Sequence, residues 1–326
     1  MKATMNLQVM SMLLLFCGTV PLSAAINDAD PIVAKYAGLY KTPPDSVGLV
    51  DPSIHACRIP DGPLLGNGDL AVAIGGTYTN QTFYLSKSDM SHSARGIGGL
   101  TISFADSAGE IAKYRQEENL FKAEVSSVIP LHRATVRMRS WTADAGNILV
   151  CDLWTDEAVP MDMSIRLWSY TDRSAAQAGT TNGIIWSTRE IVGTVGMSKD
   201  PFSSKVATAV RVLGAMPVCS TDGKKSSTAK FMVPAGTKVR IVTVVAGGYG
   251  VSNHVEQAMA AAAALNSQRI DELYADHAGW WKRYWLKSQV ELGDALLEQF
   301  YYGALYVLVV LAGLAAFLPD WRGLGI

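Results

Sequence analysis

Paired carboxylates are the residues of this sequence that could perform acid–base chemistry. Glu117 and Glu118 are adjacent, and Asp152 and Asp156 lie close together further along the chain. Two carboxyl groups can act as general acid and general base when their surroundings push their pKa values apart. Both pairs lie in polar or strand-edge segments, where carboxylates are usually exposed. We therefore interpret all four as solvated side chains and not as a catalytic pair.

Histidine and cysteine show no pattern for a metal site or a disulfide framework. The five histidines have no metal-ligand spacing with one another or with cysteine. Apart from Cys17, the cysteines are Cys57, Cys151 and Cys219, an odd number spread over a long chain. One disulfide with a free thiol and three buried thiols both remain open. We expect no metal and no cofactor.

The first 25 residues have the features of a secretory signal peptide. Lys2 precedes the apolar run Met10–Phe16, and small residues lead to Ala25, as signal peptidase requires. Cys17 follows a phenylalanine, whereas a lipoprotein signal needs a small residue before its cysteine. We expect the mature chain to begin near Ile26 and the protein to be secreted or periplasmic.

The charge balance argues against a nucleic-acid partner. The chain has 28 basic and 29 acidic residues and a formal net charge of −1. Proteins that bind the nucleic-acid backbone carry a basic patch or stripe, which this sequence lacks. A neutral ligand such as a sugar fits better. The eight Trp and twelve Tyr could stack on sugar rings, although most aromatic residues pack in cores and interfaces.

The pattern before residue 250 predicts packed antiparallel sheets. Short apolar or alternating segments follow one another, and glycine, proline and aspartate mark turns between them. Such spacing is typical of a β-sandwich. The predicted strands are Leu70–Ile74, Thr82–Leu85, Leu100–Phe104, Thr135–Trp141, Asn147–Val150, Met163–Trp168 and Lys238–Val245.

From Val255 the pattern becomes helical. Strong helix formers continue to Leu265 without a breaker, and Ser252 or Asn253 would cap this helix. A second helix is predicted from about Ser267 through the aromatic block at 280–285. A third is predicted from Asp294 to about Leu311. The coarse plan is therefore an all-β block followed by helices.

Three segments resemble glycoside hydrolase family 95, the α-L-fucosidase type, within the six-hairpin glycosidase superfamily. Gly62–Gly76 is similar to the P-L-G-N-G-x-L-G-A-x-V-x-G motif of the amino-terminal domain of that family. Gln81–Met90 looks like the stretch that follows this motif. His277–Ser288 and Phe300–Tyr306 look like the linker and the first barrel helix. The resemblance is carried by the order and spacing of the three segments.

The resemblance implies a mainly β fold: a large antiparallel β-sandwich, a helical linker and the start of an (α/α)6 barrel. The implied divisions are a signal peptide at 1–25, the sandwich at 26–250, the linker at 251–293, and a truncated first barrel helix with its tail at 294–326. In the family, the groups that run inverting hydrolysis lie beyond the point where this chain stops. No catalytic residue is carried over, and we expect the chain to be inactive alone. A non-catalytic carbohydrate-binding or structural sandwich is the alternative.

The segment Gly66–Asp69 is a turn by composition, because glycine tolerates positive φ and Asn and Asp bond to nearby backbone. A turn that leads into a strand is the simpler interpretation. The resemblance implies that this turn and the Lys87–Asp89 stretch lie near the junction of sandwich and barrel. Where the family commonly has Trp, this sequence has Ser91 or His92, so the resemblance does not identify the substrate sugar. The predicted sugar contacts are Asn67, Asp69, Lys87 and Asp89.

The carboxy-terminal end departs from the family. After Leu308 the family has a polar stretch that leads into P-P-G-L-x-G, whereas this chain stays apolar. A frameshift near Leu308 that leaves an out-of-frame tail is one explanation. The other is a membrane anchor, because Phe300–Leu318 holds no charged residue over 19 positions, about the length that crosses a bilayer. Trp321 and Arg322 would then lie at the interface.

Overall fold

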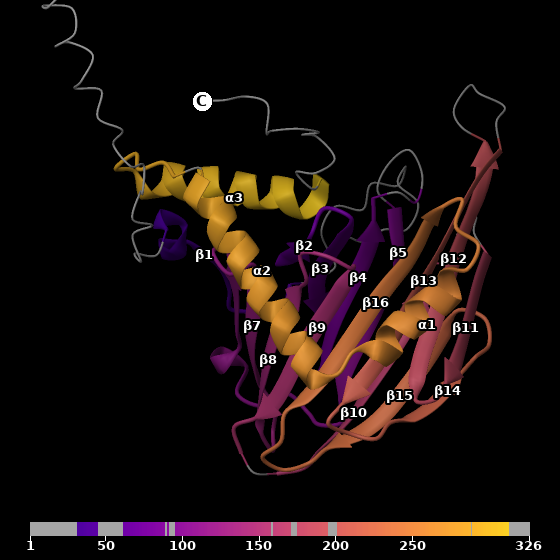
Figure 1. The fold of residues 1–326 in the computed structure, drawn as a ribbon. Helices are drawn as coiled ribbons and strands as arrows, with labels where there is room; N and C mark the ends of the chain where they lie inside the picture. The colour runs from indigo at the N-terminus through magenta and orange to yellow at the C-terminus, as the bar shows by residue number, and fades with distance from the viewer. Residues whose placement is uncertain are drawn as a thin grey trace, which may run out of the picture. The chain divides into compact units, whose positions relative to one another are not determined.

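The computed structural model describes residues 31–44, 61–88, 90, 95–157, 159–170, 175–194, 201–287 and 289–312. Within these residues sixteen strands form two antiparallel sheets, and three α-helices follow them (Figure 1). The predicted mainly β sandwich with helices after it is confirmed. The expected signal peptide, Cys57, and the chain from 313 onward lie outside the described residues.

The larger sheet has nine strands and the smaller sheet has seven. In spatial order the nine are β1 (Ala37–Tyr40), β6 (Arg115–Asn119), β7 (Glu124–Pro130), β8 (Thr135–Thr142), β9 (Ile148–Thr155), β16 (Val239–Tyr249), β13 (Pro201–Leu213), β12 (Ile184–Thr194) and β11 (Ala175–Thr181). The seven are β14 (Val218–Thr221), β15 (Ser226–Val233), β10 (Met161–Ser169), β5 (Arg95–Phe104), β4 (Asn80–Lys87), β3 (Leu70–Gly76) and β2 (Leu64–Gly66).

The main core lies between the inner faces of the two sheets. Leu149 and Ile241 of the larger sheet and Phe83 and Ile165 of the smaller sheet belong to one cluster, and each is fully buried. Burial of one such side chain stabilises the fold by about 1.5–3 kcal/mol. Each of these strands places alternate residues in this core because side chains in a strand point to opposite faces.

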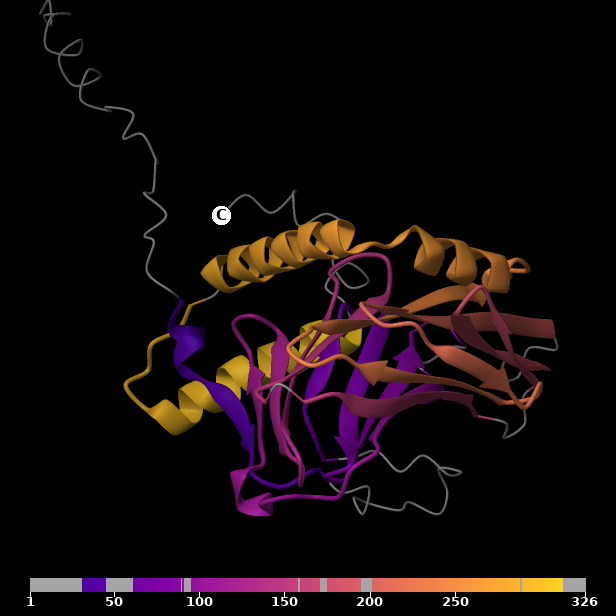
Figure 2. The ribbon, with the colours of Figure 1, turned by 90° about the horizontal axis from the view of Figure 1, so that it is seen from below.

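The outer face of the nine-stranded sheet is covered by two helices, α1 (His254–Ala264) and α2 (Ser267–Lys287), which lie across it (Figures 1 and 2). Trp141 and Val244 of the sheet pack there against Ala258 of α1 and Ile270 of α2. Strands β9 and β16 are therefore buried on both faces. This double burial explains why their sequences are nearly continuous apolar runs.

Strands β10 and β15 of the seven-stranded sheet alternate cleanly between buried and more exposed residues. In β10, Met163 and Ile165 point into the core, whereas Asp162 and Arg166 are exposed. The third helix, α3 (Ala295–Ala312), contacts this sheet at β2 and β3, which form one of its edges. The alternation is the pattern expected for a sheet with one face in the core and the other in solvent.

Helices α2 and α3 meet the sandwich in a separate aromatic cluster. It includes Trp281 and Trp285 from α2 and Tyr302 and Tyr306 from α3, each no more than 1% exposed. The indole N–H of Trp285 donates to the carbonyl of Leu120 at 3.1 Å. This packing joins the two helices to the sandwich, and Trp285, Tyr302 and Tyr306 also form hydrogen bonds.

Helix α3 is apolar on the side that faces away from this cluster. Leu296, Phe300 and Leu308 are 75%, 79% and 55% exposed. Within the described residues, no helix combines the length and the apolar character needed to cross a bilayer. The apolar run discussed above continues past Ala312 into residues outside the described part.

The predicted helix starts are observed with one difference in capping. The Asp294 carboxylate accepts hydrogen bonds from the backbone N–H groups of Leu296 and Leu297, as an N-cap does. Asn253 occupies the N-cap position of α1, but its side chain accepts a bond from Gln257 instead of from the backbone.

Candidate functional site

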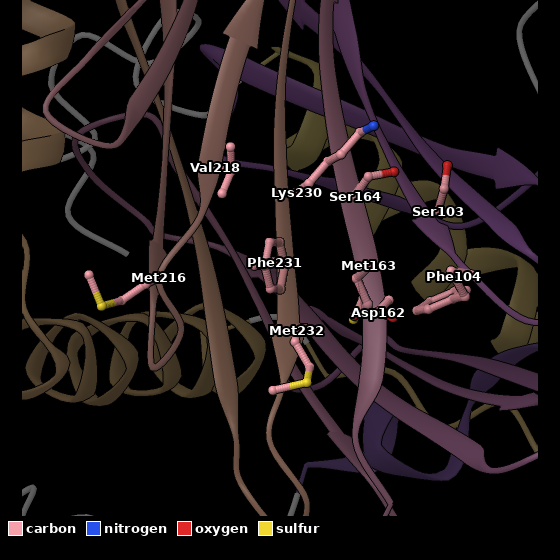
Figure 3. A pocket seen from close by; sticks show the side chains of 11 residues that line it. Ser103, Phe104, Asp162, Met163, Ser164, Met216, Val218, Lys230, Phe231 and Met232 are labelled. Atoms are coloured by element: carbon pink, nitrogen blue, oxygen red, sulfur yellow. The ribbon is translucent and has the colours of Figure 1, made fainter.

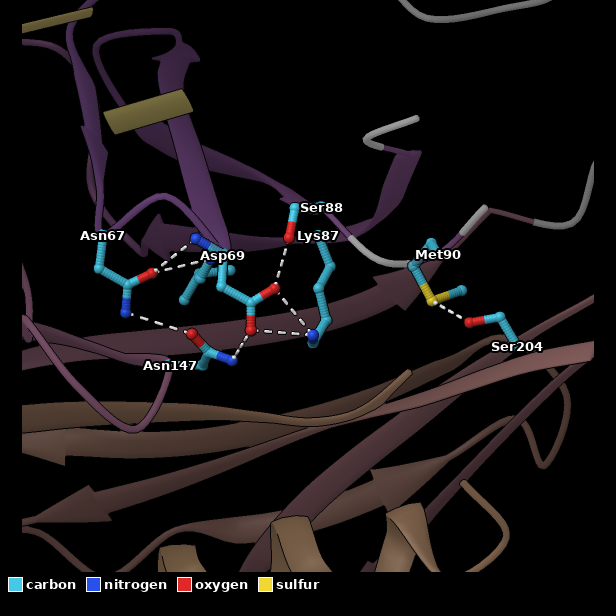
Figure 4. A network of polar contacts seen from close by, with 8 residues as sticks. Asn67, Asp69, Lys87, Ser88, Met90, Asn147 and Ser204 are labelled. Atoms are coloured by element: carbon cyan, nitrogen blue, oxygen red, sulfur yellow. Dashed lines mark hydrogen bonds and ion pairs between the residues drawn. The ribbon is translucent and has the colours of Figure 1, made fainter. Parts of the chain in front are cut away.

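The turn Gly66–Asp69 is held by the side chain of Asn67 (Figure 4). Its Oδ1 accepts hydrogen bonds from the backbone N–H groups of Asp69 at 3.1 Å and Leu70 at 2.9 Å. Its Nδ2 donates to the carbonyl of Ala143 at 3.0 Å and to Oδ1 of Asn147 at 3.2 Å. One side chain thus closes the turn and also ties it to the loop between β8 and β9 of the other sheet.

Asp69 accepts hydrogen bonds from three neighbouring side chains. Both carboxylate oxygens lie 2.9 Å from Nζ of Lys87, and the donors Ser88 and Asn147 lie at 2.7 and 2.6 Å. Burial raises the pKa of Asp69, but the hydrogen bonds from these three donors outweigh it and hold the pKa below its ordinary value. Asp69 is therefore ionised at neutral pH and cannot act as a general acid there.

The structure brings three of the four predicted contact residues, Asn67, Asp69 and Lys87, into one network, and Asp89 lies outside the described residues. Asn147 is a member that the sequence interpretation missed. It adopts φ of 50° at the end of a turn rich in Asp and Gly, so its turn role was visible in the sequence. Its contact with Asp69, which is 78 residues away in the sequence, could not be seen there.

The members of this network differ in their access to solvent. The Lys87 side chain is 4% exposed, whereas that of Asp69 is 42% exposed. A buried ammonium with a carboxylate partner is a structural ion pair, but a half-exposed carboxylate can still accept hydrogen bonds from hydroxyl groups. The arrangement suits ligand positioning or a structural junction better than acid–base chemistry. Sugar contact at these residues stays a prediction.

Glycine is required at position 66 because helix α3 approaches the turn there. A Cβ at Gly66 would lie 2.6 Å from the carbonyl oxygen of Val310 near the end of α3. The backbone N–H of Gly68, at φ of 86°, donates to the same carbonyl at 3.2 Å. The polar network therefore lies beside the carboxy-terminal part of α3.

The prediction that Glu118 is solvated is wrong. Glu118 is 9% exposed, and its Oε1 accepts a hydrogen bond from the backbone N–H of Leu64 at 2.8 Å. Burial raises the pKa of Glu118 to about 7. Strand β6 turns this side chain toward β2, where Tyr306 of α3 donates to the carbonyl of Leu64. Its neighbour Glu117 lies on the opposite face of β6 and pairs with Arg115.

The prediction for Asp152 is wrong for a different reason. Asp152 is fully buried because α2 covers its face of the sheet, and it pairs with Arg139 at 2.8 Å and Arg240 at 2.9 Å. Arg240 also binds Asp271 of α2 at 2.6 Å. Asp152 thus anchors the helix to the sheet. Asp156 is half-exposed and pairs with Arg137, as expected for a solvated carboxylate.

The thiols and possible metal ligands add no reactive centre within the described residues. No group of three or more His, Cys, Asp or Glu side chains there could hold a metal ion. Cys151 and Cys219 are both free thiols. Burial raises the pKa of Cys151 to about 12, so its reactive thiolate form is suppressed.

A groove of about 580 Å³ lies over the strands β14, β15, β10 and β5 of the smaller sheet. Lys230, Ser164 and Ser103 line it and are direct cross-strand neighbours (Figure 3). Met216 and Met232 border it and are 93% and 51% exposed. The groove therefore combines hydroxyl groups, one ammonium group, the carboxylate of Asp162 and apolar edges, none of which was identified from the sequence.

No protein-family model matches this chain. No curated protein matches its sequence either. A solved structure named as a kojibiose phosphorylase from human microbiome is similar, with a TM-score of 0.51 and 9% identity over 76% of this chain and 39% of that chain. This likeness shows a shared fold.

Two further structures are similar at lower scores. A family GH92 inverting mannosidase from Bacteroides thetaiotaomicron VPI-5482 has a TM-score of 0.49 and 12% identity over 78% of this chain and 38% of that chain. A bacterial glucoamylase complexed with acarbose has a TM-score of 0.42 and 11% identity over 76% and 40%. The chain spans about two fifths of the length of these structures.

Proposed function

We propose that this chain is the sandwich and linker part of a secreted carbohydrate-active enzyme that resembles the α-L-fucosidases of family 95. The observation that carries the proposal is the fold: a two-sheet sandwich continued by helices, shared with a protein named as a kojibiose phosphorylase. The order of the three family-like sequence segments supports the same class. The fucosidase assignment rests on those segments alone.

We also propose that the chain does not hydrolyse glycosides by itself. Inverting hydrolysis needs a general acid and a general base about 6.5–9.5 Å apart on opposite faces of the sugar. Glu118 and Asp152, the buried members of the candidate pairs, lie in separate places, one against β2 and the other under α2. Asp69 is held ionised by Lys87. These carboxylates are therefore suited to structural roles.

The test is an assay of the purified chain with aryl α-L-fucosides and aryl galactosides. We expect no release of the aryl group above the rate without protein. Release that is lost in Glu118→Gln or Asp69→Asn, while the folded fraction is unchanged, would overturn the proposal of inactivity. The exposed variant Glu117→Gln is the matched control, because its side chain pairs only at the surface.

Export of the chain belongs to the same proposal. The small-residue stretch before Ile26 supports cleavage there. Mass spectrometry of the protein recovered from periplasm or medium should give an amino terminus near Ile26. An intact amino terminus at Met1 in the exported or cellular protein would contradict this part.

A second candidate function is carbohydrate binding without catalysis. The observation that favours it is the outer face of the seven-stranded sheet, where hydroxyl groups, a groove and the half-buried Trp168 lie on neighbouring strands. Sugar binding without turnover by the purified chain would favour this function over a glycosidase role.

A further inference from the structure

The outer face of the seven-stranded sheet presents three parallel rows of side chains that cross β15, β10, β5 and β4. Successive rows are two residues apart along each strand, so the three rows span about 13 Å. The strand registers give these rows as Lys230, Ser164, Ser103 and Asn80; then Thr228, Arg166, Thr101 and Thr82; then Ser226, Trp168, Gly99 and Tyr84. Apart from Gly99, every member is polar or aromatic.

Trp168 lies flat against the sheet in the third row. A Cβ at Gly99, its cross-strand neighbour, would meet the indole ring at 2.3 Å, so the ring occupies the space that a side chain would take. The indole N–H donates to Thr101 at 3.2 Å. The rings of Tyr84 and Tyr170 meet the indole edge-on, with centroids at 6.0 and 5.3 Å. These contacts hold the indole as a fixed aromatic surface.

Covering a cross-strand glycine is also a structural role for tryptophan. Trp186 does the same over Gly179 in the other sheet, where the Cβ would again meet the ring at 2.3 Å. Trp186, however, packs against the helix-covered cluster, whereas Trp168 belongs to none of the described core clusters. The ring of Trp168 is therefore suited to stack on a ligand such as a sugar ring.

Two cations lie next to this aromatic surface. Arg166 and Lys230 are both exposed. They are diagonal neighbours on β10 and β15, so their Cα atoms are expected to lie about 7–8 Å apart. Neither forms an ion pair with a described residue. The carboxylate of the groove lining, Asp162, lies on the other side of Ser164 from Arg166 and is also a diagonal neighbour of Lys230. Two neighbouring cations of this kind complement an anionic group.

We propose that this face binds an anionic oligosaccharide, with a sugar ring on Trp168 and a carboxylate or sulfate group at Arg166 and Lys230. The hydroxyl groups of Ser103 and Ser164 lie in the same groove as Lys230 and can bond to sugar hydroxyls (Figure 3). The inference rests on the proposed carbohydrate role of the chain, and it is independent of catalysis. The Asn67–Asp69 network takes no part in it.

The test is titration calorimetry of the whole chain with three oligosaccharides of equal length: uronate-containing, sulfated and neutral. We expect one or both anionic ligands to bind at least tenfold more tightly than the neutral one. Comparing the uronate-containing ligand with the sulfated ligand decides between a carboxylate and a sulfate group. Equal affinity for all three would overturn the proposal. So would tighter binding of a single-stranded oligonucleotide, which also offers anionic groups and stacking rings.

Three variants locate the site. Trp168→Ala should weaken binding of the anionic ligand at least tenfold. The double variant Arg166→Gln with Lys230→Gln should abolish the preference for anionic over neutral ligands. The matched control removes two exposed cations elsewhere, Lys113→Gln with Arg115→Gln, and should leave binding unchanged. Thermal unfolding checks that each variant is folded, and the charge variants remain informative if Trp168→Ala unfolds.

Failure here can be distinguished from failure of the proposed function. Unchanged binding in both Trp168→Ala and the double charge variant would refute the site while leaving a sugar-binding chain. Release of sugar from an aryl glycoside without anionic binding would refute the site and support a glycosidase. Binding of neither sugar nor anion, with no turnover, would count against both proposals.

Discussion

The outer faces of the two sheets use the same local device in different surroundings. In each, a tryptophan lies over a cross-strand glycine, Trp186 over Gly179 and Trp168 over Gly99. Helices cover the first face, so strand β16 there is mostly apolar on both sides. The second face keeps a polar and aromatic surface. The difference shows that a local pairing does not define a role, because the role depends on what packs over it.

The largest expected effect comes from placing a carboxylate on each face. Val244→Asp puts a charge beneath α1, at a residue 1% exposed, and should cost about 4 kcal/mol or more of unfolding free energy. Ser164→Asp on the open face should change it by less than about 0.5 kcal/mol. Urea unfolding of both variants measures the difference. Similar losses would mean that the second face is also covered.

The polar network between the sheets should give the next largest effect. Asp69→Ala removes the carboxylate that pairs with the buried ammonium of Lys87, which should cost about 3 kcal/mol. Glu117→Ala removes an exposed partner of Arg115 and should cost less than about 1 kcal/mol. Urea unfolding compares the two variants. An equally small loss in Asp69→Ala would show that Lys87 reaches solvent or another partner.

The buried carboxyl of Glu118 should make stability depend on pH. Its pKa in the folded chain, about 7, lies above the ordinary value of 4.5, so folding favours the protonated form. Its contribution is full below pH 4.5 and is lost as the pH rises through 7. Glu118→Gln removes the charge and should raise stability at about pH 8 by on the order of 2–3 kcal/mol.

Urea unfolding at about pH 5 and about pH 8 measures this dependence. In the control variant Glu117→Gln, the free energy of unfolding should still be lower at the higher pH than at the lower pH, as in the unmodified chain. If Glu118→Gln kept it as well, the carboxyl of Glu118 would not be its source.

The smallest expected effect compares the two tryptophans directly. Trp186→Ala removes packing against the helix-covered cluster and should cost about 2–3 kcal/mol. Trp168→Ala removes a ring that lies outside the core clusters and should cost about 1 kcal/mol while weakening ligand binding. Thermal unfolding gives the difference. A larger loss for Trp168 would assign it a mainly structural role.

Much of the sandwich was predictable, because period-2 alternation and turn residues mark its strands. All seven predicted strands overlap strands of the two sheets, and the helices begin close to the predicted residues. Nine of the sixteen described strands were not predicted. Strand β6 is one of them, because its sequence, Arg-Gln-Glu-Glu-Asn, has no apolar residue. Its alternation is nevertheless present, since Gln116 and Glu118 are buried while Arg115 is exposed. A local hairpin with β7 and the non-local pairing with β1 make this segment a strand.

The candidate site was predictable only in part. The composition of the turn indicated a role for Asn67 and Asp69, and both hold the network that the structure shows. The sequence did not indicate the contact between Asn147 and Asp69 or the burial of Glu118 and Asp152. Each of these depends on an element that is distant in sequence.

The sequence by itself determined which residues alternate, where helices replace strands, and which glycines permit the turn before β3. Only the tertiary structure decided which sheet face the helices cover, which carboxylates lose contact with water, and which tryptophan stays outside the core. The reason is that backbone preference and periodicity act over a few neighbouring residues. Burial depends on surfaces that meet after the chain has folded, and burial sets the pKa values and the accessible chemistry.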